Sequence, residues 1–167
     1  EEEVRYFLHG TLEDLHDPYL LKGMEEGSAF LYGAIREKRR ICIIGDYDVD
    51  GICSTYVLYH ALQLLGAAVS YRIPHRIKDG YGLNEEIIRE CSGQQVEVIV
   101  TCDNGIAAAK EIALAKELGM EVLVTDHHEV PYREITGAEG MTEREEILPP
   151  SLVIDPKQKG CPYPYKG

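Results

Sequence analysis

Four short apolar runs, the first three each followed by an amphipathic stretch, constrain the fold of this chain more than any other feature. The runs lie at residues 41–45, 68–73, 96–101 and 121–125. Strands that are apolar without alternation are typical of a parallel sheet buried on both faces. We therefore predict an α/β fold, a doubly wound and mainly parallel sheet with helices on both faces. The remaining expected elements are helices at 52–65, 84–91 and 106–118 and a short last strand at 152–154.

The flanking segments are less regular. Residues 1–40 have helical composition interrupted by glycines, so we expect a helical lead-in ahead of a catalytic domain at 41–167. Residues 129–150 carry several glutamates without periodicity. We expect a surface excursion there, either functional or disordered.

Chain length and composition limit the number of domains and the cellular location that we expect. A length of 167 residues suits one domain with its own core. No apolar run reaches bilayer length and the chain begins with three glutamates, so we expect a cytoplasmic protein without membrane association. Four cysteines adjoin apolar segments without metal-type spacing and are expected to be buried, reduced thiols: Cys42, Cys53, Cys91 and Cys102.

Charge argues against a simple nucleic-acid-binding surface. The net charge is −12, from 17 basic and 29 acidic residues. Such an excess repels nucleic acid unless the charges are locally arranged or bound cations offset them.

Polar clusters follow three of the expected strands. They are Asp-Tyr-Asp-Val-Asp-Gly at 46–51, Asp-Asn-Gly at 103–105 and Asp-His-His at 126–128. In open parallel sheets ligands bind at the carboxyl ends of strands, so the three clusters can converge on one crevice. Any one cluster alone is more typical of a loop or helix cap, but their repetition favours a metal site.

Two other interpretations of the first cluster fail. An EF-hand needs a preceding helix and a glutamate at loop position 12, where this chain has an apolar run before Asp46 and Val57 at that position. An aspartyl-phosphate phosphatase matches residues 46–49 but gives no role to a histidine pair.

Carboxylates with imidazoles suit Mn²⁺, with Mg²⁺ as a substitute. Two such ions would activate water for in-line phosphodiester hydrolysis. Gly51 and Gly105 are each expected to open a helix whose free N–H groups could bind phosphate, although they could equally serve tight turns. Arg76 offers a planar fork for phosphate and Tyr81 a ring for base stacking, while an ordinary loop explains that segment equally well.

Taken together, these motifs resemble the successive motifs of RecJ-type exonucleases, members of the DHH phosphoesterase family. The resemblance rests on residues 44–51, Pro-His-Arg at 74–76, Gly-Tyr-Gly-Leu at 80–83, Asp-Asn-Gly-Ile at 103–106 and Asp-His-His-Glu at 126–129. The Asp-His-His run alone would mark only the wider family. The helical lead-in and the C-terminal stretch after residue 154 are also similar to those of RecJ-type exonucleases.

The resemblance implies a role for each site residue. The implied metal ligands are Asp48, Asp50, Asp103 and His127. The implied catalytic residues are Asp46 beside the metals, His128 on the scissile phosphate and Asp126 orienting the histidines. The implied substrate-binding residues are Arg76 at the 5′ phosphate, Tyr81 on a base, and Asn104 with Gly105.

The resemblance further implies a single-stranded-DNA-specific 5′ to 3′ exonuclease of DNA repair and recombination, with two Mn²⁺ or Mg²⁺ ions. The family's site is completed by a later aspartate and a basic second domain. We therefore expect an incomplete catalytic core with weak Mn²⁺ binding and little activity alone, whose partners are single-stranded DNA, single-strand-binding or repair proteins and the missing C-terminal domain. The alternatives are an oligoribonuclease or cyclic-dinucleotide phosphodiesterase, or a non-catalytic nucleic-acid-binding scaffold.

Overall fold

The centre of the molecule is a five-stranded sheet in which every neighbouring pair of strands is parallel, with the order β2-β1-β3-β4-β7. The computed structural model describes residues 2–77, 82–136 and 142–166. The strands are β1 (Arg40–Ile44), β2 (Ala68–Arg72), β3 (Val98–Cys102), β4 (Glu121–Thr125) and β7 (Leu152–Ile154).

The apolar runs form the inner strands because both of their faces are covered. All five residues of β3 are buried, as are the last four of β1. At the edge, β2 is mostly exposed and has a more mixed sequence. The predicted α/β sheet is therefore confirmed.

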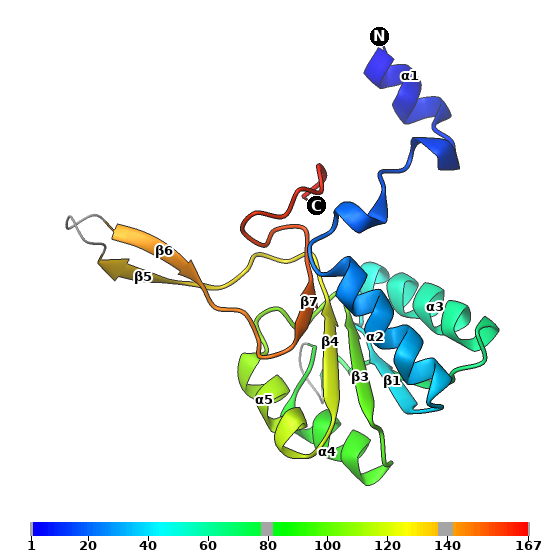
Figure 1. Cartoon of the computed structure of the whole chain (residues 1–167), viewed down its shortest axis with the longest axis vertical. Coiled ribbons are helices and arrows are strands. Elements are labelled where there is room, and N and C mark those ends of the chain that lie inside the picture. The colour runs from blue at the N-terminus through cyan, green and yellow to red at the C-terminus, as the bar shows by residue number, and fades with distance from the viewer. Residues whose placement is uncertain (1, 78–81, 137–141, 167) are drawn as a thin grey trace.

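Helices cover both faces of this sheet (Figure 1). On one face, α2 (Met24–Arg36) and α3 (Val49–Leu64) contribute to the core with Ala34 and Leu62. On the other face, α4 (Glu85–Gly93) and α5 (Ala109–Glu117) contribute Ile88 and Ile112. This arrangement confirms the doubly wound fold.

The strand order reverses between β1 and β3. From β1 the chain crosses through α3 to β2 on one side, and it then returns through α4 to β3 on the other. The connections after β1 and β3 therefore diverge, which is the arrangement that opens a ligand crevice at the carboxyl ends of the strands.

The lead-in is helical but irregular. It contains α1 (Glu2–His9), two 3₁₀ turns, η1 (Leu12–Asp14) and η2 (Pro18–Leu20), and then α2. The tail returns to this segment, since Lys22 Nζ donates to the Lys159 carbonyl at 2.9 Å. The division into a lead-in and a separate domain stays a prediction.

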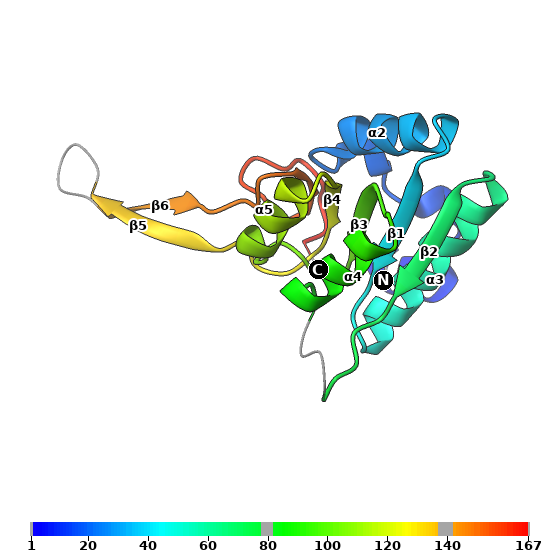
Figure 2. The same cartoon turned by 90° about the horizontal axis from the view of Figure 1, so that it is seen from below.

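The acidic segment after β4 is a surface excursion, as expected, but it contains regular strands that we did not predict. It forms an antiparallel hairpin, β5 (Tyr132–Thr136) and β6 (Thr142–Glu146), that stands away from the body of the molecule (Figure 2). Cross-strand pairs support it: Arg133 forms an ion pair with Glu145, and the Arg144 guanidinium lies 4.3 Å from the Tyr132 ring centroid.

Three local expectations need correction. Cys53 is exposed rather than buried, because it lies on the wall of an open cavity between α3 and α2. The helix expected at 106–118 is α5 and begins at Ala109. Ile106 is therefore buried in the turn before it. Gly51 lies inside the first turn of α3, and Gly105 lies in a turn before α5 with φ of 109°, so neither opens a helix.

No helix within the described ranges is both long and apolar enough to cross a bilayer.

Candidate metal centre

The loop after β1 carries two carboxylates in contrasting surroundings. Asp46 is 1% exposed, and its Oδ1 has no hydrogen-bond partner within the described part of the chain. Asp48 is exposed and caps α3, where its Oδ1 accepts from Gly51 N at 3.0 Å. A buried carboxylate oxygen without a partner is costly, so Asp46 fits a cation better than an apolar surrounding.

The loop after β3 is held in an uncommon backbone conformation. Asp103 has φ of 61°, in the left-handed region that few side chains adopt. The next residue, Asn104, is buried and donates from Nδ2 to the carbonyls of Ile44 at 3.0 Å and Cys102 at 2.8 Å. These two bonds join the carboxyl ends of β1 and β3. They thereby hold the neighbouring Asp103 carboxylate between the two strand ends.

Asp126, after β4, organises the third loop. Its Oδ1 accepts from the backbone N–H groups of His127 (2.7 Å) and His128 (3.2 Å) and from His128 Nδ1 (2.7 Å). Its Oδ2 accepts from Ile106 N at 3.0 Å, which joins this loop to the loop after β3. The bond to Nδ1 fixes the orientation of the His128 ring beside Asp103.

Among the described residues, two groups of side chains could each hold a metal ion, and they share Asp103. One group is Asp103 with His127 and His128; the other is Asp46 with Asp48 and Asp103. Within each group the donor atoms lie within 4.8 Å of one another, and His127 Nε2 is 2.8 Å from Asp103 Oδ1. A carboxylate shared by two ion sites is compatible with two-metal chemistry, in which the ions lie about 3.5–4 Å apart.

Asp50 stands outside both groups, although we predicted it as a ligand. It lies in the first turn of α3, exposed, on the wall of a cavity that also contains Asp103 and His127. Asp48 is the helix cap, and two further residues rotate the side chain by about 200°. The ligand role of Asp50 stays a prediction.

The electrostatics of the cluster favour the binding of a cation. Burial raises the pKa of Asp103, and the neighbouring Asp48 carboxylate adds to this, while His127 opposes it. The bond from Gly51 N lowers the pKa of Asp48. Burial opposes protonation of His128, but its hydrogen bond to Asp126 and the two nearby carboxylates raise its pKa overall. A divalent cation would relieve the crowding of negative charge around Asp103.

The predicted substrate-binding residues have separate positions. The Arg76 guanidinium lies 5.4 Å from the ring centroid of Tyr47, beside the first acidic loop. Asn104 and Gly105 line a cavity of about 540 Å³ together with Asp126 and His128. Tyr81 lies outside the described residues. The binding roles of all four stay predictions.

Asp155 is a candidate site residue that sequence reasoning missed. It follows β7 as the other clusters follow their strands, and the register places it beside Asp126. It is fully buried; Oδ1 accepts from Lys157 N at 2.7 Å and Oδ2 has no partner among the described atoms. Burial raises its pKa to about 6. The sequence signal that could have identified Asp155 is its position directly after a predicted strand.

Comparison of the sequence with known protein families identifies the class of protein to which this chain belongs. The family model for the DHH family, N-terminal domain, matches residues 40–150, and the chain belongs to that family. The Asp-His-His run at 126–128 lies within the matched residues, directly after β4.

The relatives within the family are RecJ exonucleases. The chain is 42% identical over 165 residues to the single-stranded-DNA-specific exonuclease RecJ of Bacillus subtilis, covering 99% of this chain and 19% of that protein. A crystal structure of exonuclease RecJ bound to manganese matches with a TM-score of 0.70 and 36% identity, over 84% of this chain and 32% of that one. RecJ from Thermus thermophilus in complex with Mn²⁺ matches with a TM-score of 0.66 and 32% identity, over 87% of this chain and 18% of that one. The chain thus spans about a fifth of the length of the Bacillus subtilis relative.

Proposed function

We propose that this chain is the metal-binding part of a single-stranded-DNA-specific 5′ to 3′ exonuclease that uses two Mn²⁺ or Mg²⁺ ions. The observation that carries the proposal is that three loops distant in sequence bring two groups of metal-type donors together around Asp103. Relatives named single-stranded-DNA-specific exonucleases, and solved relatives bound to manganese, support it.

In this proposal Asp46, Asp48, Asp103 and His127 hold the ions, with Asp50 within reach along the cavity wall. Bound cations would polarise the scissile phosphate and make a water molecule nucleophilic at neutral pH.

The other site residues would position the substrate phosphate and supply a proton to the leaving oxygen. Asp126 holds His128 through Nδ1, so the opposite ring nitrogen can contact the phosphate or give a proton to the leaving oxygen. Arg76, beside the first acidic loop, would bind the 5′ phosphate as a charge-assisted pair. Cytoplasmic chromosomal DNA during repair is the setting we propose, with single-strand-binding or repair proteins as partners.

Calorimetric titration with MnCl₂ tests the metal site directly. Asp103→Asn and His127→Ala should weaken Mn²⁺ binding by more than about tenfold. The control Glu134→Gln removes an exposed carboxylate from the hairpin and should leave binding unchanged. Equal affinity in all four proteins would remove the basis of the proposal.

Substrate choice is tested with the full-length protein. We expect 5′-labelled single-stranded DNA to release labelled mononucleotide and duplex DNA to be resistant. Faster hydrolysis of short RNA or cyclic dinucleotides would favour the other enzymes of the family, and metal binding without hydrolysis of any substrate would indicate a scaffold.

A further inference from the structure

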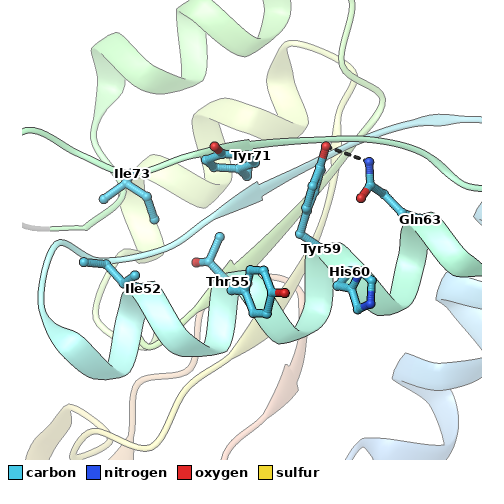
Figure 3. A pocket seen from close by; sticks show the side chains of 8 residues that line it. Ile52, Thr55, Tyr59, His60, Gln63, Tyr71 and Ile73 are labelled. Atoms are coloured by element: carbon cyan, nitrogen blue, oxygen red, sulfur yellow. Dashed lines mark hydrogen bonds between the residues drawn. The ribbon is translucent and has the colours of Figure 1, made fainter.

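A pocket between α3 and the edge strand β2 lies apart from the cavities of the candidate metal centre (Figure 3). Its volume is about 330 Å³, which is within the usual range of ligand pockets. The α3 residues that line it lie on the opposite side of the helix from those that line the cavity with Asp103 and His127. The residues that line this α3–β2 pocket are Ile52, Thr55, Tyr56, Tyr59, His60, Gln63, Tyr71 and Ile73.

Aromatic rings dominate the α3–β2 pocket, and their neighbours hold them in place. The Tyr56 ring lies nearly parallel to the His60 imidazole, at an interplanar angle of 7° and a centroid distance of 5.9 Å. Tyr59 meets Tyr71 of β2 edge to face, with centroids 5.0 Å apart. Gln63 Nε2 donates to the Tyr59 hydroxyl at 2.8 Å. The rings are therefore ordered before any ligand binds, which lowers the entropic cost of binding.

Two of these rings have much of their surface in solvent. Tyr56 and Tyr71 are both exposed, although they lie against His60 and Tyr59. An exposed ring that is already held by a second ring can stack on a further planar group in an offset arrangement. The α3–β2 pocket therefore suits a planar aromatic ligand.

The charge of the lining narrows the choice of ligand. The chain has 29 acidic residues, yet the described residues that line the α3–β2 pocket include no carboxylate, lysine or arginine. Both cavities at the metal centre, by contrast, contain carboxylates. Hydroxyl, amide and imidazole groups in the lining can pair with the polar edge of an uncharged ring. A nucleobase has these properties, and bases stack readily on tyrosine rings.

The α3–β2 pocket adjoins the loops of the metal centre. Thr55 and Ile73 both lie directly against Gly45, where an added Cβ would collide with them. Gly45 immediately precedes Asp46, and Ile73 lies three residues before Arg76. The segments that form this end of the pocket therefore continue into the metal-type donors and the predicted phosphate-binding residue. A single strand bound at the metal centre would have another of its bases next to the pocket.

We propose that the α3–β2 pocket is a nucleobase-binding site, in which a base of a bound single strand stacks on the exposed tyrosine rings. The inference rests on the proposed nuclease function, because that function supplies the strand. Stacking accepts every base, so the pocket would add affinity without sequence preference. A proline-rich peptide also docks on aromatic surfaces, but the continuity with the metal centre favours a nucleic-acid strand.

Binding of a single-stranded oligodeoxynucleotide to the full-length protein, in EDTA to prevent hydrolysis, tests the proposal. Tyr56→Ala should weaken binding at least about fivefold, whereas Tyr56→Phe retains the ring and should bind like the parent. Tyr32→Ala is the matched control: Tyr32 is 64% exposed on α2, outside the pocket, and Tyr56 is 66% exposed on α3. This control should leave the affinity unchanged. Equal affinity of Tyr56→Ala and the parent would overturn the proposal.

An abasic oligonucleotide tests whether the ligand is a base. Without bases nothing stacks on the ring, so Tyr56→Ala and the parent should bind this strand equally. If Tyr56→Ala lost as much affinity for the abasic strand as for normal DNA, the proposal would be wrong. A proline-rich peptide that binds the parent but not Tyr56→Ala, with DNA affinity unchanged, would assign the pocket to a protein partner instead.

Hydrolysis in Mn²⁺ separates this inference from the nuclease proposal. Tyr56→Ala should raise KM for the strand and leave kcat unchanged, because the stacked base contributes equally to binding of the substrate and the transition state. A parent protein that cleaves no single strand would contradict the nuclease proposal. A parent that cleaves, together with an unchanged KM in Tyr56→Ala, would contradict the nucleobase site alone.

Discussion

Replacing Gly51 with alanine should damage both the fold and the metal centre. A Cβ atom at this position would lie 2.5 Å from Asp46 N, 2.6 Å from Asp46 O and 2.7 Å from Asp46 C. These are backbone atoms, so no side-chain rotation relieves the contact, and the overpacking cost lies near the upper end of its usual range, about 3 kcal/mol. Alanine returns about 1 kcal/mol through its greater helix propensity. The expected net loss of unfolding free energy is about 2 kcal/mol.

Gly33 supplies the matched control. It is also a helical glycine, in α2, but nothing lies within 4 Å of an added Cβ. Gly33→Ala should therefore gain about 0.5–1 kcal/mol from helix propensity. Thermal unfolding should show a midpoint lower by about 4–8 °C for Gly51→Ala and slightly raised for Gly33→Ala.

Mn²⁺ affinity gives a second measurement on the same pair. Gly51→Ala pushes the first turn of α3 away from Asp46 and should weaken binding, whereas Gly33→Ala should not. If Gly51→Ala were as stable as Gly33→Ala and bound Mn²⁺ equally well, the close approach of α3 to the acidic loop would be wrong.

Three further predictions concern buried polar groups. Asn104→Ala should cost about 1–3 kcal/mol of unfolding free energy, because two buried backbone carbonyls lose their donor; urea denaturation measures this. Asp126→Asn places an amide against four donors and should weaken Mn²⁺ binding about 10–100-fold in calorimetry. The pKa of Asp155 is raised from 3.8 to about 6, so its favourable contribution is complete below about pH 4 and is lost as the pH rises through 6. Metal-free Asp155→Asn should gain stability over the parent between about pH 4 and 7, by up to ~3 kcal/mol, and show no gain at about pH 4.

The sheet and its helices could be predicted because their signals are local. Buried strands such as β3 need uninterrupted apolar residues, and the helices between them need a periodic apolar face. The three metal-type clusters were found for the same reason, since each follows a strand directly. The hairpin was missed because β5 and β6 bury no face, so their residues lack alternation and depend on pairs such as Arg133 with Glu145.

The details of the site depend on angles that the sequence does not show. In the sequence Asp46 and Asp50 are equivalent candidates. Because α3 begins after the Asp48 cap, Asp46 lies with the metal-type donors, whereas Asp50 lies on the cavity wall. Asp155 escaped notice because β7 is only three residues long and a proline follows.

The hairpin offers a practical route to a labelled protein. The chain leaves the body and returns at neighbouring points, where Ile147 N donates to the Pro131 carbonyl at 2.7 Å. Extra residues inserted between β5 and β6 would therefore lengthen the hairpin without changing how β4 pairs with β7. A fluorophore or affinity tag placed there would report on the molecule while leaving the carboxylates and imidazoles undisturbed.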